Sequence, residues 1–570
     1  MNNNVFLAVL LSFGILVGFQ FFYVNPQQEA LQNRRAIQHV APESITAPSA
    51  ASSPVQAALP RDQVLRQNPR VTIQSPVLAG SINLRGARFD DLVLSSYRET
   101  VDKNSPPITL LSPSGSSAPY RPYYVSFSWL ADFNVLDVPN DETIWKADRN
   151  ALTPDHSVQL SWRNKQGLLF LRTVAVDKEY MFTITDRVVN ESGRDVMLYP
   201  FGLAARQGIP PHETSSVVHE GPLAVLDGTL DEVDYDDVMD DGKISKKSKG
   251  GWIGITDKYW LVAMVPPQND LMVGEFAYNR AGAVLPKDGF FQADFRGNPV
   301  SISTGGSVER VTHLFAGPKR VDLLDQYADQ YDIPRFDRAI DFGWFYFLTR
   351  PFLSLLSLME SATGSMAWAI LLFTILLRIA VLPLSQKSYR SMARMKEIQP
   401  EMKRIQERFA DDRMRQSQEM MELYKREKVN PLSGCMPTLI QIPIFFALYK
   451  VLYVNIEMRQ APFFGWIHDM AIPDPTSLFN GFGLLPYDVP SFLQIGAWPV
   501  LMGLSMFLQQ KLSPQPPDKS QARIFMILPV VFTFMLAHMP AGLVIYWTWS
   551  NLLGILQQWY IMRGVRNKTA

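Results

Sequence analysis

Met366-Ala-Trp-Ala-Ile-Leu-Leu-Phe-Thr-Ile-Leu-Leu-Arg-Ile-Ala-Val-Leu-Pro-Leu384 is an apolar run interrupted by one cation, Arg378. At about 1.5 Å per residue, the run is long enough to cross a bilayer as a helix. A cation at mid-membrane costs roughly 2.5–3.5 kcal/mol on insertion scales, which favours an arginine that faces protein or trapped water. Thr374 lies one turn earlier on the same helical face. The alternative is an arginine that snorkels to the nearer interface, and this segment alone does not separate the two.

The length and composition of the chain indicate several domains and a membrane location. At 570 residues the chain exceeds a single ordinary domain, and its formal net charge of zero gives no reason to expect DNA binding. Its one cysteine, Cys435, excludes an intrachain disulfide, and we expect a packed, inert thiol there. The first apolar run, from Val5 to Val24, lacks a basic flank and a cleavage site, so we expect an uncleaved anchor over residues 1–24.

More apolar segments are concentrated in the C-terminal part of the chain. Aromatic and leucine residues at helical spacing predict an amphipathic helix at the membrane interface over 340–360. Five further spans are then expected within a core domain of 361–565, at 366–385, 434–454, 492–510, 524–538 and 541–561. With the anchor, this gives an α-helical membrane bundle of six spans.

The charges of the connecting loops predict the orientation of this bundle. The loop at 386–433 carries twelve Lys and Arg residues against eight Asp and Glu, whereas 455–491 carries one basic residue, Arg459. The positive-inside rule places the first loop in the cytoplasm and the second outside. Six spans and a basic tail over 566–570 then require both termini in the cytoplasm and an exported domain after the anchor.

The exported region changes character along its length. Residues 25–70 are rich in Ala, Gln, Pro and Ser and predict a flexible linker. Over 71–335, short β-rich runs separated by turn residues predict an all-β sandwich domain; the clearest runs are 71–74, 123–129, 180–185 and 300–303. The acidic stretch 231–237 lacks the spacing of a calcium loop, so we expect a solvated loop there.

The basic loop at 386–433 is typical of a helical hairpin. Good helix formers fill 388–409 and 413–428, and Asp412 is well placed to cap the second helix. Methionines on such a hairpin can offer a pliable surface for apolar guests, or they can pack the two helices together. The residues expected to take part in docking are Met395, Met402, Asp411, Asp412 and Met420.

The motifs of catalysis and of cofactor binding are absent from the sequence. There is no Walker A loop, HExxH, G-x-S-x-G or clustered Cys/His, so we expect no enzyme activity, no cofactor and no metal. Polar residues do occur within the predicted spans. Each fits a helix–helix hydrogen bond, and together they are candidates to line one hydrated cavity: Arg378, Thr374, Gln441, Tyr546, Trp547 and Ser550.

Several motifs closely resemble those of the YidC/Oxa/Alb family of membrane protein insertases. They include 378–384 (RIAVLPL), 418–425 (QEMMELYK), 429–437 (VNPLSGCMP) and 542–547 (GLVIYW), within a match that spans about 340–565. The exported domain, with Gly250-Gly-Trp252, is similar to that of the Gram-negative YidC form, which implies a β-supersandwich related to galactose mutarotases.

The resemblance implies a fold and a site. It implies a five-helix insertase core around a hydrophilic groove that opens to the cytoplasm and to lipid but is closed outside. The groove arginine maps onto Arg378, a polar position of the same span onto Thr374, and a substrate-contacting aromatic onto Trp547, where some members carry Tyr. It also implies the bacterial inner membrane as the location. The implied partners are nascent membrane proteins, the ribosome, the SecYEG and SecDF translocon components and the signal recognition particle pathway.

Two other functions are compatible with parts of the sequence. A secondary transporter predicts inverted repeats and broken helices, and neither is evident here. A sugar-processing enzyme in the exported domain would need paired acid and base residues, for which His212 with Glu213, or His313, are the only hints. His212 and His219 are the only close histidine pair, and their spacing does not predict a metal site.

Overall fold

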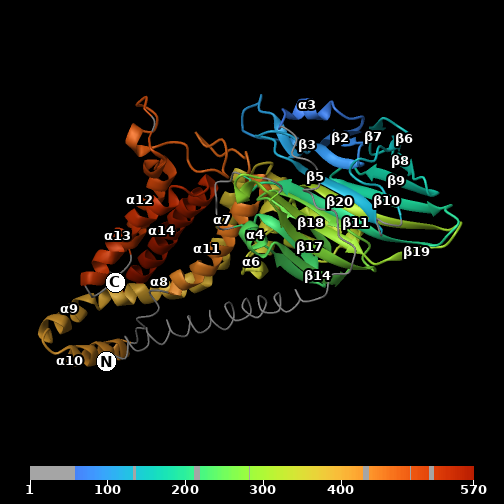
Figure 1. Cartoon of the computed structure of the whole chain (residues 1–570). Helices are drawn as coiled ribbons and strands as arrows, with labels where there is room; N and C mark the ends of the chain where they lie inside the picture. The colour runs from blue at the N-terminus through green and yellow to red at the C-terminus, as the bar shows by residue number, and fades with distance from the viewer. Residues whose placement is uncertain are drawn as a thin grey trace. The chain divides into compact units, whose positions relative to one another are not determined.

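The computed structural model describes residues 58–131, 136–210, 218–280, 283–427, 436–487, 489–512 and 519–569. The chain divides into two compact units, with the boundary between Asp341 and Phe342. The first is built largely of strands and the second of helices (Figure 1). The predicted anchor over 1–24 and most of the predicted linker lie outside the described residues.

The strands of the first unit form two large sheets (Figure 1). In the larger sheet the order is β14 (Lys243–Lys249), β17 (Leu271–Asn279), β18 (Phe290–Gly297), β11 (Val196–Gln207), β5 (Tyr123–Leu130), β3 (Arg88–Arg98), β2 (Leu78–Asn83), β1 (Arg70–Gln74) and β7 (Ala151–Leu152), with β19 (Val300–Ile302) on β11 and β4 (Pro107–Leu111) on β3. In the smaller sheet it is β13 (Thr229–Glu232), β12 (Gly221–Leu226), β15 (Trp252–Thr256), β16 (Trp260–Val265), β20 (Ser307–Pro318), β10 (Met181–Asn190), β9 (Leu168–Val176), β8 (Val158–Arg163) and β6 (Lys146–Ala147).

The two sheets pack against each other through aromatic side chains. Phe89 of β3 meets Phe182 of β10 edge-on, with ring centroids 5.4 Å apart. The Tyr123 hydroxyl of β5 donates a hydrogen bond of 3.3 Å to the Ile255 carbonyl of β15. Alternating burial along strands such as β9 places one side-chain row of each strand in this core. The four strand runs chosen from the sequence all form strands, which confirms the β-rich prediction.

Two parts of this unit differ from the prediction. The predicted linker ends earlier than residue 70, because α3 (Arg61–Leu65) buries Val64 and pairs Arg61 with Asp91. The acidic stretch is not a loop: it forms the end of β13 and helix α4 (Tyr235–Asp241). Buried Tyr235 and Val238 hold α4 on the domain, a contribution that its acidic composition hides.

The helical unit contains the amphipathic helix, the hairpin and the candidate spans. Its helices are α6 (Tyr346–Thr363), α7 (Met366–Ala380), α8 (Leu382–Glu397), α9 (Gln399–Arg408), α10 (Arg413–Arg426), α11 (Met436–Val454), α12 (Ala497–Leu512), α13 (Lys519–Leu536) and α14 (Ala541–Thr569). Helix α14 packs against α12, α7, α8 and α11, and α13 lies beside α12 (Figure 1). Within the described residues, no single helix has both the length and the hydropathy of a membrane span, whereas the bent pair α7 and α8 has both.

The first predicted core span ends earlier than expected. Helix α7 stops at Ala380, and α8 leaves it at an angle of 61°. Pro383 lies in the first turn of α8, where it is tolerated, and it disfavours a continuous helix through the preceding residues. The chain therefore turns near Val381, and α8 continues into the hairpin.

The hairpin has the predicted form. Asp412 accepts hydrogen bonds from the backbone N–H groups of Met414 and Arg415, which confirms it as the cap of α10. Arg426 of α10 pairs with Glu401 of α9 at 2.5 Å. The first predicted helix is divided at Ile398, where α8 ends and α9 begins.

Candidate functional site

The direction of Arg378 follows from the two faces of α7. Ile370 and Thr374 are buried in the protein, whereas Leu372, Leu376 and Ile379 are exposed. Arg378 follows Thr374 by four residues, so it shares the buried face. The guanidinium therefore points into the helical unit and away from the apolar outer surface.

Arg378 binds α14. Its Nη2 donates to the Ser550 carbonyl oxygen at 2.6 Å and to the Ser550 hydroxyl at 2.7 Å. The buried Tyr389 side chain of α8 lies beside it. These contacts favour an inward-facing arginine over one that snorkels to an interface.

Gly554 makes room for this contact. A Cβ at this position would lie 3.3 Å from Arg378 Nη2 and 3.2 Å from Gln509 Nε2. The absent side chain leaves space for the guanidinium where it bonds Ser550, one turn earlier on α14. A small residue is therefore required at position 554 by the packing of α7, α12 and α14.

Polar side chains continue along the same face of α14. Tyr546, Ser550, Gly554 and Gln558 recur at intervals of four residues, so they form one row. Gln441 Nε2 of α11 donates to the Tyr546 hydroxyl at 3.3 Å. Gln558 is almost fully buried, and its Nε2 has no hydrogen-bond partner among the described residues. We call this row, with Arg378, Tyr389 and Gln441, the polar cluster.

Two predicted site residues make their contacts outside the polar cluster. Thr374 is fully buried and donates to the Ile370 carbonyl of its own helix at 2.6 Å. Trp547 packs between Phe445 and Phe532, with ring centroids 4.5 and 5.6 Å away. The structure thus brings Arg378, Gln441, Tyr546 and Ser550 together, and it shows Trp547 in an apolar contact.

The Arg378 guanidinium is hydrogen-bonded to uncharged groups. Among the residues that the structure describes, no carboxylate forms an ion pair with it. The carbonyl and hydroxyl oxygens of Ser550 accept hydrogen bonds from its Nη2 without cancelling its charge. The polar cluster therefore keeps a net positive potential, which attracts acidic groups.

The hairpin methionines are divided between core and surface. Met402 is buried with Ile398 and Leu423, and Met395 and Met420 pack against them. Asp411 and Asp412 are exposed, as are Met414 and Met421. A docking role for Met395, Met402 and Met420 stays a prediction, and Met414 and Met421 are accessible to solvent on the hairpin.

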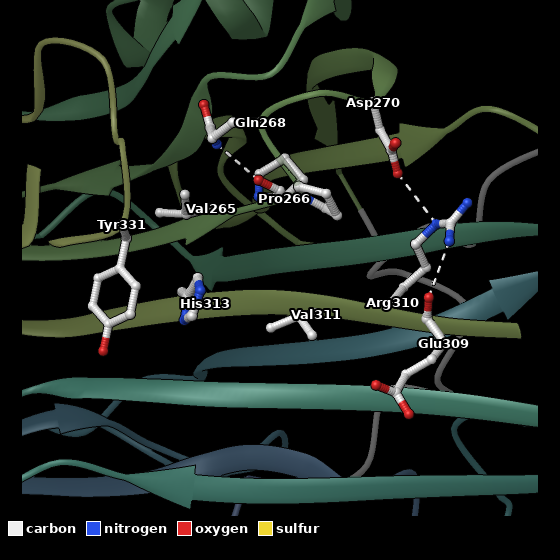
Figure 2. Close-up of a pocket in the computed structure, with 10 residues that line it drawn as sticks. Val265, Pro266, Gln268, Asp270, Glu309, Arg310, Val311, His313 and Tyr331 are labelled. Atoms are coloured by element: carbon white, nitrogen blue, oxygen red, sulfur yellow. Dashed lines mark hydrogen bonds and ion pairs between the residues drawn. The ribbon is translucent and has the colours of Figure 1, made fainter.

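The β-rich unit has a recess of about 370 Å³ that contains His313 (Figure 2). His313 Nδ1 lies 3.2 Å from the Thr183 hydroxyl, and its ring contacts Tyr331 at 4.2 Å between centroids. Burial lowers the pKa of His313. Asp270 pairs with Arg310 at 3.2 Å, so this carboxylate is not paired with His313 as an acid/base couple. His212 and Glu213 lie outside the described residues, and the described part of the chain contains no cluster fit for a metal.

Sequence reasoning missed several members of the polar cluster. Tyr389 belongs to the predicted hairpin, and nothing in its sequence context indicates a contact with a span. Gly554 and Gln558, however, follow Tyr546 and Ser550 at four-residue spacing. That spacing predicts a polar row along one helical face.

Comparisons with known proteins cover both units. A family model described as 60Kd inner membrane protein matches residues 358–568, and one described as YidC periplasmic domain matches 70–355. A membrane protein insertase YidC of Beijerinckia indica is 46% identical over 586 residues, covering 99% of this chain and 96% of its own length. Its counterpart in Rickettsia bellii is 44% identical over 567 residues, covering 98% and 99%.

Solved structures give weaker likenesses. A crystal structure of an active YidC insertase is 16% identical, with a TM-score of 0.36, and covers 87% of this chain and 93% of that one. A putative aldose 1-epimerase from Escherichia coli is 10% identical, with a TM-score of 0.31, and covers 44% of this chain and 99% of that one. At these scores, neither likeness establishes anything about the site.

Proposed function

The chain belongs to the YidC family of membrane protein insertases, and from that premise we propose that the polar cluster around Arg378 is its route for client segments. The family places the protein in the inner membrane with a largely β-sheet periplasmic domain. Its activity is insertion of nascent membrane proteins, and it is not an enzyme.

The observation that carries this proposal is the inward, hydrogen-bonded and carboxylate-free position of Arg378. A cation held by Ser550 stays inside the helical unit, where the local dielectric constant is lower than in water. Water and acidic peptide groups are both stabilised beside such a charge. We infer a hydrophilic groove here that opens to the cytoplasm and to lipid.

The outer faces of the helices support a membrane position for this unit. Helix α13 exposes a continuous apolar surface that includes Phe525, Ile527 and Val531. Helices α7 and α12 expose similar rows, and such large apolar patches on a protein mark contact with lipid or protein. We propose six spans with both termini in the cytoplasm, as the loop charges predict.

The mechanism needs no fuel. The short polar or acidic exported segment of a client enters the groove beside Arg378 and crosses the bilayer where the groove thins it. Its apolar segment then partitions into lipid along α11 and α13, and each buried CH₂ contributes about 0.8 kcal/mol. Trp547 and Phe445 offer an apolar wall at the groove for that segment.

Partners on the cytoplasmic and membrane sides follow from the same proposal. The basic hairpin suits delivery from the ribosome and the signal recognition particle pathway, with exposed Met414 and Met421 as contacts. Cooperation with SecYEG and SecDF would serve clients whose exported segments are too long for the groove.

Reconstitution tests the proposed function. The purified full chain is placed in liposomes with a small client that has one span and a short acidic exported segment. We expect the exported segment to become protected from added protease without nucleotide. Equal protection in liposomes that lack the chain would contradict the proposal.

A further inference from the structure

The loop between α11 and α12 presents an apolar tip. Between Asp474 and Lys511 the chain carries one charged residue, Asp488. Over 477–487, six large side chains are exposed, and Leu484 is the most exposed at 87%. The six are Leu478, Phe479, Phe482, Leu484, Leu485 and Tyr487. We call residues 477–487 the loop tip.

The backbone of the loop tip is closed on itself. Phe482 N–H donates to the Ser477 carbonyl at 2.6 Å, and Leu485 N–H donates to the Asn480 carbonyl at 3.0 Å. Gly481 has a φ of +62°, which permits the tight turn. The Tyr487 hydroxyl donates to another carbonyl of the tip. Internal hydrogen bonds of this kind lower the cost of placing a loop in an apolar medium.

The base of the loop is fixed to the start of α12. The Asp474 carboxylate accepts hydrogen bonds from Trp498 N–H at 2.9 Å and from Trp466 Nε1 at 3.1 Å. Leu478 N–H donates to the Ile495 carbonyl at 2.8 Å. The indoles of Trp466 and Trp498 lie 6.3 Å apart, and paired tryptophans are typical of a membrane–water interface. An anchored base with paired tryptophans is suited to interface depth, and the apolar tip follows it directly in the chain.

We propose that the loop tip inserts into the outer leaflet of the inner membrane and anchors the periplasmic end of α12 there. This inference rests on the proposed orientation of the spans. Lipid is favoured over a protein partner because the tip is uncharged, has a closed backbone and is joined directly to a candidate span. Its anchoring would hold the periplasmic side of the helical unit at a fixed depth while clients move.

Fluorescence quenching tests this contact in the full chain. Leu484→Cys is introduced in a Cys435→Ser background, labelled with an environment-sensitive fluorophore and reconstituted into phosphatidylethanolamine–phosphatidylglycerol vesicles. We expect doxyl-labelled lipid to lower its emission by about twofold or more, and aqueous iodide to have little effect. Val284→Cys, whose side chain is 86% exposed on the β-rich unit, is the matched control and should show the reverse pattern.

The outcomes separate the alternatives. Phe492→Cys, at a second exposed apolar position of the same loop, guards against a local folding defect at Leu484. Quenching by iodide alone, or shielding from both quenchers, would overturn the proposal, since the tip would then face water or a protein. Arg378→Gln in the same vesicles should reduce insertion and leave lipid quenching at position 484 unchanged. Failure of the groove and failure of the lipid contact are therefore distinguishable.

Discussion

Replacing Arg378 by glutamine removes the charge of the polar cluster and leaves a shorter side chain that is still polar. Wild-type Arg378 donates two short hydrogen bonds to Ser550, and hydrogen bonds to charged groups contribute about 1.5–3 kcal/mol each. Loss of these bonds affects every client alike. The attraction between Arg378 and a client carboxylate affects only acidic clients. The ratio of the insertion of acidic clients to that of neutral clients therefore isolates the effect of the charge.

The size of that ratio follows from Coulomb's law. At about 4 Å the attraction is about 1 kcal/mol in bulk water and about 4 kcal/mol at an effective dielectric constant near 20. Arg378 is half-buried, so we place it between these limits, at about 2–3 kcal/mol. Each 1.4 kcal/mol is about tenfold, so Arg378→Gln should lower the preference for acidic clients by about 30- to 150-fold.

The assay compares two forms of one small client in liposomes, with Asp or Asn in its exported segment. Arg378→Lys is the control: it retains the charge and should keep most of the preference, although its shorter side chain reaches less far towards Ser550. Several client sequences are compared, because clients with neutral exported segments should tolerate loss of the arginine. An equal loss for the Asp and Asn forms, or no loss, would refute the reasoning.

Three other residues give independent tests. Gly554→Leu should displace Arg378 and reduce insertion several-fold. Gly554→Ala needs a shift of only a few tenths of an ångström in its neighbours and should retain most activity. Equal insertion by the leucine variant and the wild type would contradict the packing argument. Burial lowers the pKa of Lys319 to about 8. Between that pH and the ordinary lysine pKa of 10.5, the unfolded chain binds more protons than the native domain, so the free energy of unfolding rises with pH. Lys319→Met should remove this rise in denaturant titrations, and an unchanged pH dependence would count against the buried-lysine explanation. Asp412→Ala should weaken the start of α10 by about 1 kcal/mol, seen as faster amide hydrogen exchange, whereas Asp412→Asn should retain most protection; identical exchange in both would argue against the cap.

Local chemistry made several elements predictable. Asp412 was identified as a cap because an acidic residue stands before a run of helix formers, and such hydrogen bonds involve near neighbours in the chain. The strands around 123–129 and 180–185 were predicted because β-branched and aromatic residues are bounded by turn residues. The inward direction of Arg378 was one of two alternatives that its own segment left open, and only the resemblance to the insertase family favoured it.

Long-range contacts were harder to predict. Tyr389 reaches Arg378 only because the chain bends at Val381, and the sequence placed that break later. Trp547 was predicted to face the groove through its polar neighbours, but its ring contacts depend on Phe445 and Phe532 from two other helices. The burial of α4 depends on Tyr235 and Val238, which an acidic composition conceals.

Accessibility of Gln441 tests the central claim most directly. Gln441 is half-buried and bonded to Tyr546, one turn from the residue that holds Arg378. In a Cys435→Ser background, Gln441→Cys should react with a membrane-impermeant maleimide added to the cytoplasmic face of sealed inverted vesicles, and should not react in right-side-out vesicles. Labelling from the periplasmic face, or from neither face, would contradict a water-filled groove that is open on the inner side only.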